Sequence, residues 1–266
     1  MQHKMSVITP TRNMGRFLET CILSVLLLDY PDCEHIVVDG DSQDNTREIL
    51  KRYRHIKWVS EPDRGLSDAL NKGIPIATGD IIGSCNADDL NLPGTLHMVN
   101  EYFESRPELD VLYGDYRETD GMGRLLRIRR ETHFSPFLLR WLHICLVACP
   151  SAFWRKRIHD TAIWFDEELH YAMDYEFFRK ALDTGCRFKH VSVLFSDLRR
   201  HPASKTATGH QQEEHELIIR RDSGALQRLA GPLFPVMRSV CLVAARVART
   251  FEKVLRGFYI EQLCRR

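Results

Sequence analysis

Two acidic residues, Asp88 and Asp89, stand side by side just after an apolar segment, residues 80–85, that has the composition of a buried strand. Adjacent carboxylates repel each other, so either a cation is bound between them or one of them stays protonated. Hard oxygen ligands suit Mg²⁺ or Mn²⁺, and Mg²⁺ usually completes its shell with substrate phosphates and water. The pair therefore indicates a metal site for a phosphate ester; the alternative is that both acids only favour the start of the next helix.

Polar residues also follow three earlier strand-like segments. The sequences are "TPTRN" at residues 9–13, "DGDSQD" at residues 39–44 and "SEPDRG" at residues 60–65. In open α/β sheets ligands bind outside the carboxyl ends of the strands. These loops and "NADD" are therefore expected to form one site.

The elements that would position these loops alternate along the first half of the chain. Strands are expected at residues 5–11, 35–40, 56–62 and 80–85, with helices near residues 14–28, 41–53 and 65–77. Such alternation is typical of a mostly parallel sheet with helices on its faces. The second half is less regular: strands are expected at 111–116 and 123–131, a buried helix and then a strand within 134–158, and a helix over 171–185.

Composition excludes several classes of protein. The chain has 266 residues, 44% hydrophobic and 27% charged, which is ordinary for a globular protein. Its eight cysteines form no CxxC pair, which favours a reduced, cytoplasmic compartment, and no targeting or membrane-spanning segment is recognised. Residues 220–266 hold ten Lys or Arg against three acids, so the preceding part is acidic and nucleic-acid binding is not expected.

Phosphate-binding signatures are missing, because neither GxxxxGK[ST] nor GxGxxG follows the first strand. Four blocks instead resemble glycosyltransferase family 2 enzymes of the GT-A fold, and they occur in the family's order. They are "VITPTRNMGRFLETCILSVL", "IVVDGDSQDNT", "SEPDRGLSDALNKGIPIATGDIIGSCNADD" and "YAMDYEFF". The resemblance implies an α/β GT-A fold, a nucleotide-sugar donor, a saccharide or lipid-linked acceptor, and Mn²⁺ or Mg²⁺ as cofactor.

The resemblance also assigns roles to residues of the first half. Asp39 would contact the nucleotide base, and Thr11 and Arg12 would lie beside the donor. Asp89 would be the main metal ligand, with Asp88 facing the ribose or sharing the metal. The departure is Asn86, where some relatives carry an acid.

Further donor contacts are implied for Asp63 and Arg64, whereas the expected role of Asn71 and Lys72 is to stabilise the loop and the end of the helix. The family's lid over the donor phosphates corresponds to "LRRHPASKT", with Arg200, His201, Ser204 and Lys205 as candidates. His201 is a candidate metal ligand there; the alternative is a solvated side chain.

An inverting transferase needs a carboxylate that removes the acceptor's proton. Asp174 in "YAMDYEFF" matches the family's base, and Glu176 is the reserve candidate. The alternative for Asp174 is an exposed helix acid, but its aromatic neighbours predict a buried helix, in which an unpaired acid is costly.

The basic tail contains a predicted amphipathic helix, with apolar residues at helical spacing from Val236 to Phe258. We expect a GT-A domain over residues 1–218 and a helical extension over 219–266. The extension either packs on the domain or makes a peripheral contact with anionic membrane at the cytoplasmic face.

The sequence therefore predicts a metal-dependent, inverting glycosyltransferase that uses a UDP-sugar by default and acts in polysaccharide or glycolipid assembly. The rivals are a non-catalytic nucleotide-sugar or membrane-binding protein on this fold and a sugar-nucleotide pyrophosphorylase. The second would need a glycine-rich basic loop, which "TPTRNMGRF" does not provide.

Overall fold

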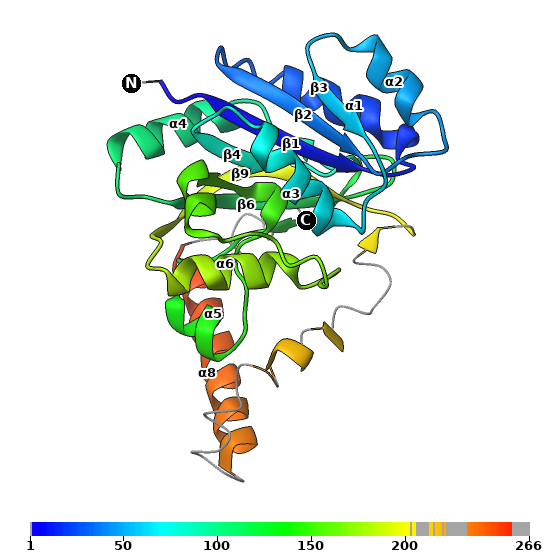
Figure 1. The fold of residues 1–266 in the computed structure, drawn as a ribbon. Helices are drawn as coiled ribbons and strands as arrows, with labels where there is room; N and C mark the ends of the chain where they lie inside the picture. Colours follow the sequence, from blue (N-terminus) through cyan, green and yellow to red (C-terminus); the bar gives the residue numbers. More distant parts are fainter. Residues whose placement is uncertain are drawn as a thin grey trace.

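The computed structural model describes residues 2–202, 204–205, 213–214, 216–219, 221 and 233–256. A curled sheet forms the centre, helices cover it, and one long helix extends from one end of the molecule (Figure 1). Within the described residues no helix has the length and apolarity that crossing a membrane requires.

The first half builds the parallel part of the sheet, in the order β3-β2-β1-β4. Its strands are β1 (Met5–Thr11), β2 (Cys33–Asp39), β3 (Lys57–Ser60) and β4 (Ile81–Ser84). Its helices are α1 (Gly15–Leu26), α2 (Thr46–Arg52) and α3 (Leu66–Ile76). All residues of β1 and β4 are buried, which explains why these strands read as continuous apolar runs.

Helix α3 lies close against β1 because Gly73 has no side chain. A Cβ at this position would come within 2.6 Å of the Ile8 Cγ2 atom and 3.3 Å of the Val38 Cγ2 atom. The glycine therefore sets how closely the helix covers the strands whose ends carry the predicted loops.

The second half extends the sheet in the order β8-β6-β9-β5, with β7 on β6. The strands are β5 (Leu90–Asn91), β6 (Val111–Asp120), β7 (Leu125–Arg129), β8 (Ala152–Arg155) and β9 (Phe188–Arg200). The helices are α4 (Thr95–Ser105), α5 (Pro136–Trp141), α6 (Met173–Asp183) and α8 (Phe234–Leu255), with 3₁₀ turns at Cys149–Ser151 and Lys156–Thr161. Since β8 is antiparallel to both β4 and β6, the sheet is parallel over its first four strands and mixed beyond them.

The expected buried helix within residues 134–158 is much shorter in the structure. Helix α5 begins at Pro136, where the Ser135 side chain accepts a hydrogen bond from the Leu138 amide, and it ends at Trp141. His143 then has a φ of 56°, a left-handed conformation that cannot continue the helix. The apolar residues that follow line the interior without regular structure.

The predicted boundary between residues 218 and 219 falls where the structure describes only part of the chain. Helix α8 packs through Leu242 and Ala245 against the cluster of buried residues that contains Tyr113 and Tyr175. The division into a domain and an extension therefore stays a prediction.

Trp154 on β8 is the largest fully buried side chain, and its replacement should destabilise the fold strongly. Its ring contacts Phe165, Phe177 and Phe178, with centroids 5.4–6.4 Å apart, and its Nε1 donates to His159 Nε2 at 2.9 Å. Trp154→Ala is expected to lower the free energy of unfolding by about 3–5 kcal/mol.

Urea unfolding followed by circular dichroism measures this change. Trp141→Ala is the matched control, because this ring is 45% exposed and its removal should change the free energy of unfolding by no more than about 0.5 kcal/mol. Equal effects of the two substitutions would contradict the assigned packing.

Candidate active site

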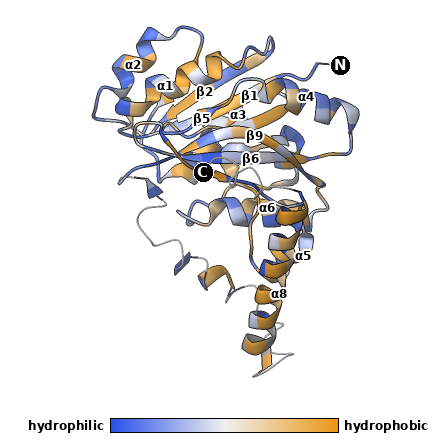
Figure 2. Cartoon of the chain, turned by 180° about the vertical axis from the view of Figure 1, so that it is seen from behind, coloured by the Kyte–Doolittle hydropathy of each residue, from blue (hydrophilic) through white to orange (hydrophobic). Residues whose placement is uncertain are grey.

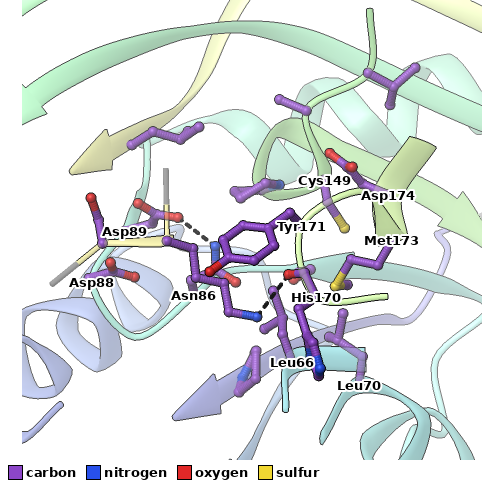
Figure 3. Close-up of a pocket in the computed structure, with 18 of the residues that line it drawn as sticks. Leu66, Leu70, Asn86, Asp88, Asp89, Cys149, His170, Tyr171, Met173 and Asp174 are labelled. Atoms are coloured by element: carbon purple, nitrogen blue, oxygen red, sulfur yellow. Dashed lines mark hydrogen bonds between the residues drawn. The ribbon is translucent and has the colours of Figure 1, made fainter. Parts of the chain in front are cut away.

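A cavity of about 990 Å³ opens at the carboxyl ends of the parallel strands (Figure 3). Its wall comes from segments far apart in the sequence, namely residues 10–14, 63–70, 84–89, 143–150 and 170–175, together with Tyr116, Arg129, Glu131, Leu198, Arg199, Arg200, Ser204 and Lys205. The expected convergence of the "PTRN", "PDRG" and "NADD" loops is thus present in the fold. Asp88 and Asp89 lie on one side of the cavity, and Asp174 lies on the other.

Asp88 is paired with His201, which follows β9. The Asp88 Oδ2 atom lies 3.0 Å from the His201 Nε2 atom, and the imidazole packs against Phe17 of α1 with ring centroids 4.7 Å apart. Adjacent ligands of an octahedral Mg²⁺, each at about 2.1 Å, are also separated by about 3 Å. The spacing of these two atoms therefore fits two neighbouring positions of a metal shell.

Asp89 has a different environment from its neighbour. Its Oδ1 atom accepts a hydrogen bond from the Arg199 amide and its Oδ2 atom accepts one from the Asn86 side chain, both at 2.9 Å. Burial, followed by the charge of Asp88, raises the pKa of the Asp89 carboxyl well above its usual value. Asp89 therefore ties the acidic loop to β9, and its predicted role as the main ligand stays a prediction.

The metal would need further ligands beyond this pair. The described residues contain no group of three or more His, Cys, Asp or Glu side chains that could hold a metal ion. Mg²⁺ sites often use one or two carboxylates and take the remaining oxygens from substrate phosphates and water. Asp88 and its partner His201 suit that type of site, because Asp88 lines a cavity large enough for a ligand.

Asp174 lies in the first turn of α6 and lines the cavity. Its Oδ1 atom accepts a hydrogen bond from the Tyr175 amide at 2.8 Å, and burial raises the pKa of the carboxyl to about 6. A carboxylate with this pKa is mostly deprotonated at neutral pH and more basic than an ordinary aspartate. Asp174 can therefore act as a general base.

Glu176, the reserve candidate for the base, has a structural environment. Its side chain is 1% exposed and forms ion pairs with Arg179, Lys180 and Arg221. It is absent from the residues that line the cavity. The structure thus favours Asp174 over Glu176.

Of the predicted donor residues in the first half, Thr11, Arg12 and Asp63 line the cavity. Burial raises the pKa of the Asp63 carboxyl, whose Oδ1 atom accepts a hydrogen bond from the Gly65 amide at 3.0 Å. Gly40 allows this carboxylate to approach β2, since a Cβ there would lie 2.2 Å from the Asp63 Oδ2 atom.

Asp39 and Arg64 are not among the lining residues. Asp39 is fully buried and accepts hydrogen bonds from Ser42 and from the Ser60 hydroxyl, the latter at 2.6 Å. The Arg64 side chain is 67% exposed and is paired with Glu167. Their donor contacts remain predictions.

The cations predicted near the donor phosphates also reach the cavity. Arg200 and Lys205 both line it, together with Ser204. Arg200 donates to Glu118 at 2.9 Å, and the Lys205 Nζ atom donates to the His170 carbonyl at 3.1 Å. Burial lowers the pKa of Lys205. These contacts hold two cationic side chains at the cavity wall, and their role toward a diphosphate stays a prediction.

Sequence reasoning missed Glu214, which holds the loop before Asp174. Its carboxylate accepts hydrogen bonds from the amides of His170, Tyr171 and Ala172 at 2.7–3.1 Å. A negative charge is favourable next to a helix N-terminus, and Ala172 is the N-cap of α6. Nothing in the local sequence around Glu214 indicates this contact, because its partners lie more than 40 residues away.

We expect Glu214→Ala to lower kcat about tenfold, since the freed amides let the start of α6 shift and displacements of about 1 Å are costly in catalysis. Glu214→Gln keeps one acceptor oxygen and should recover most of the rate. Steady-state rates at saturating donor and acceptor measure both variants. Wild-type kcat in the alanine variant would exclude this positioning role.

The chain matches a family model described as glycosyl transferase family 2 over residues 6–162. Hyaluronan synthase of Pasteurella multocida is 24% identical over 220 residues, which cover 80% of this chain but only 22% of the synthase. An uncharacterized glycosyltransferase of Rickettsia typhi is 28% identical over 237 residues, which cover 84% of this chain and 72% of that protein.

Solved structures share the fold. S. aureus TarS (residues 1–349) in complex with UDP-GlcNAc has a TM-score of 0.68 at 21% identity, covering 84% of this chain and 66% of that 1–349 chain. The mannosyltransferase PcManGT from Pyrobaculum calidifontis, in complex with GDP-Man and Mn²⁺, has a TM-score of 0.58 at 17% identity, covering 99% and 85%. The chain therefore has the GT-A fold and belongs to glycosyl transferase family 2.

Proposed function

We propose that this glycosyltransferase moves a sugar from a nucleoside-diphosphate sugar to an acceptor hydroxyl with inversion at the anomeric carbon. The observation that carries the proposal is that Asp88, which is paired with His201, and Asp174 line the same cavity. The fold neighbours were solved with UDP-GlcNAc and with GDP-Man and Mn²⁺, which supports a donor of this class. A UDP-sugar is the default donor.

In the proposed reaction Asp174 removes the proton from the acceptor hydroxyl while the oxygen attacks the anomeric carbon. The nucleoside diphosphate leaves from the opposite face of the sugar, so the configuration inverts. The raised pKa of Asp174 suits it to this role, because the carboxylate is then a stronger base that is still deprotonated at neutral pH.

Negative charge develops on the leaving diphosphate and has to be stabilised. Asp88 and His201 would hold Mn²⁺ or Mg²⁺, which, when bound, acts as a Lewis acid toward the phosphate oxygens. Arg200 and Lys205 are cationic side chains of the cavity wall. We assign them to the diphosphate, and Arg12 and Asp63 to the nucleoside side of the donor.

The acceptor class is a saccharide or a lipid-linked saccharide in polysaccharide or glycolipid assembly. Relatives named hyaluronan synthase and chondroitin synthase support a saccharide acceptor, although the chain spans only about a fifth of their length. Tyr116, Arg129 and Glu131 line the same cavity and are available to an acceptor.

A panel of UDP-, GDP- and dTDP-sugars, each incubated with and without Mn²⁺, tests the proposal. A transferase releases the nucleoside diphosphate from one of them in the presence of metal, and faster when the acceptor is added. A pyrophosphorylase would instead exchange pyrophosphate with the sugar nucleotide. A non-catalytic protein would bind a donor without any turnover, so the two rivals give separate results.

A further inference from the structure

Helix α8 presents a continuous apolar row to solvent. Val236, Val240, Val243, Val247 and Phe251 follow one another at intervals of three or four residues, and each is 60–64% exposed. No charged residue interrupts the row, which is the orange outer side of α8 in Figure 2. Solvent-exposed apolar surface of this extent on a helix indicates an interaction site.

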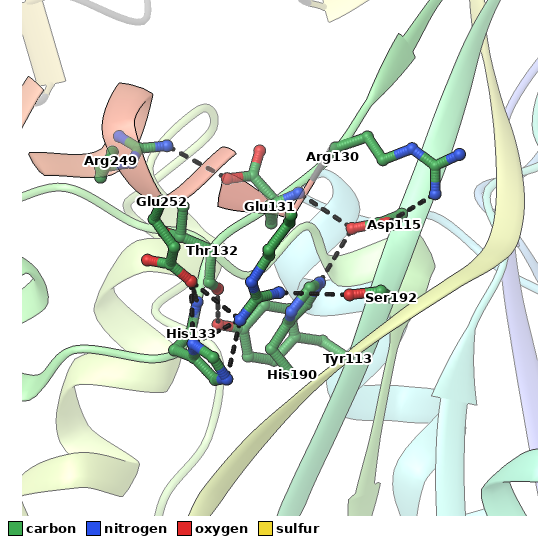
Figure 4. A network of polar contacts seen from close by, with 11 residues as sticks. Tyr113, Asp115, Arg130, Glu131, Thr132, His133, His190, Ser192, Arg249 and Glu252 are labelled. Atoms are coloured by element: carbon green, nitrogen blue, oxygen red, sulfur yellow. Dashed lines mark hydrogen bonds and ion pairs between the residues drawn. The ribbon is translucent and has the colours of Figure 1, made fainter. Parts of the chain in front are cut away.

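The opposite side of α8 is fixed to the domain, so the row cannot simply turn inward. Leu242 packs against the core, and the Arg249 Nη2 atom lies 3.1 Å from the Glu131 Oε2 atom. The Glu252 Oε1 atom lies 2.8 Å from the His133 Nδ1 atom (Figure 4). These contacts orient the helix with its valine row facing away from the protein.

The charges beside the row are all positive. Arg246 is exposed next to it, and Lys253 is half-buried further along the same border. The single acidic residue of α8, Glu252, is turned toward His133 on the docked side. An apolar row bordered by Arg and Lys is the pattern of a helix that lies in the interface of an anionic membrane.

Two aromatic side chains lie on the neighbouring helix α5. Phe137 and Trp141 are 51% and 45% exposed, and both views place α5 beside the upper part of α8 (Figures 1 and 2). Tryptophan is enriched at the level of lipid headgroups because its ring is apolar and its N–H is polar. Exposed apolar side chains are thus present on a second helix beside α8.

A second copy of the chain fits this surface less well than lipid does. A helix pair that buried two valine rows would bring the flanking residues of both copies together. Each copy contributes Arg246 and Lys253 to that border and no acidic residue. Like charges placed opposite each other are unfavourable, whereas anionic headgroups would neutralise them.

We propose that the outer face of α8 docks on an anionic lipid surface and holds the enzyme at the membrane. Apolar side chains enter the headgroup region, and the bordering cations contact lipid phosphates. The binding is reversible and salt-sensitive, since it combines modest apolar burial with screened electrostatics. It does not depend on the identity of the donor or on catalysis.

Sedimentation of the full-length protein with lipid vesicles tests the proposal. The wild type is expected to bind vesicles of phosphatidylcholine with 30% phosphatidylglycerol at least about tenfold more strongly than pure phosphatidylcholine, because each cation near an anionic surface adds about 1 kcal/mol. Val243→Glu with Val247→Glu should reduce this binding at least tenfold. Arg246→Glu should reduce the preference for the anionic vesicles.

Leu26→Glu with Leu27→Glu is the matched control, since these leucines are 52% and 67% exposed at the end of α1, far from α8. This variant should bind vesicles like the wild type. Thermal melts check that the variants are folded. Undiminished binding by the α8 double variant, or no vesicle binding by the wild type, overturns the proposal. The proposal is also overturned if the wild type does not bind vesicles but forms a dimer in sedimentation equilibrium, and the α8 double variant is a monomer.

Discussion

Asp174→Asn is expected to lower kcat for sugar transfer by about 10²–10⁴-fold, the usual contribution of a positioned general base. The substitution keeps the size of the side chain and its position in the first turn of α6, but it removes the carboxylate that is assigned as the base. Release of the nucleoside diphosphate at saturating donor and acceptor measures the effect.

The pH dependence of the wild-type rate provides a second readout of the same residue. The pKa of Asp174 is raised by burial to about 6, so the rate should fall below pH 6 as the base becomes protonated and should level off above it. A residual rate in the asparagine variant should lack this step. A wild-type rate that is independent of pH between 5 and 7.5 would contradict the assignment.

Stability measurements separate a catalytic defect from unfolding. The pKa of Asp174 is higher in the folded protein, about 6, than its ordinary value of 3.8, so protonation favours the folded state. That stabilisation is present at low pH and is lost as the pH rises through 6. At pH 8 the Asn variant should therefore melt at the same temperature as the wild type or higher. Full activity in a folded variant would show that another residue is the base.

Asp88→Ala is expected to reduce kcat/KM by at least about 100-fold at fixed Mn²⁺. A metal ion that stabilises the leaving diphosphate contributes several kcal/mol, and each 1.4 kcal/mol corresponds to a tenfold change in rate. The substitution leaves His201 as the remaining member of the pair. Mn²⁺ affinity, followed by electron paramagnetic resonance, should fall together with activity.

Asp89→Asn is the informative comparison, because sequence reasoning favoured Asp89 as the main ligand. In the structure both of its oxygens accept hydrogen bonds, from Arg199 and Asn86, so an amide there would place a donor against a donor. We expect a lower melting temperature with Mn²⁺ affinity largely kept. Loss of Mn²⁺ binding in Asp89→Asn, with binding intact in Asp88→Ala, would reverse the assignment.

The loops of the first half could be predicted because each follows a buried strand that is visible as an apolar run. Thr11 ends such a run, Arg12 follows it and Asp88 lies in the loop after another, and parallel strands bring their carboxyl ends to one edge of the sheet. This prediction does not require the order of the strands in the sheet. Each short segment contains both a buried strand and the polar residues at its end, so it indicates the chemistry of the loop and also its position at the edge of the sheet.

Other features depend on contacts that no local pattern carries. Strand β9, which carries Arg200, was not expected, and its pairing with β6 joins residues about 80 positions apart. The same holds for Glu214, whose partners are three backbone amides. The sequence alone does not distinguish the positions of Arg64 and Asp174. In the structure Arg64 is paired with Glu167, whereas Asp174 lines the cavity.

Calorimetric titration of UDP, GDP and dTDP, each with Mn²⁺ and again with EDTA, tests the central claim most directly: acidic and basic side chains from distant loops hold a metal-bound nucleoside diphosphate in one cavity. We expect at least one of the three nucleotides to bind in the presence of Mn²⁺, and EDTA to weaken this binding at least about tenfold. Binding of none of them, or equally strong binding in EDTA, would contradict a metal-bound nucleoside diphosphate in this cavity.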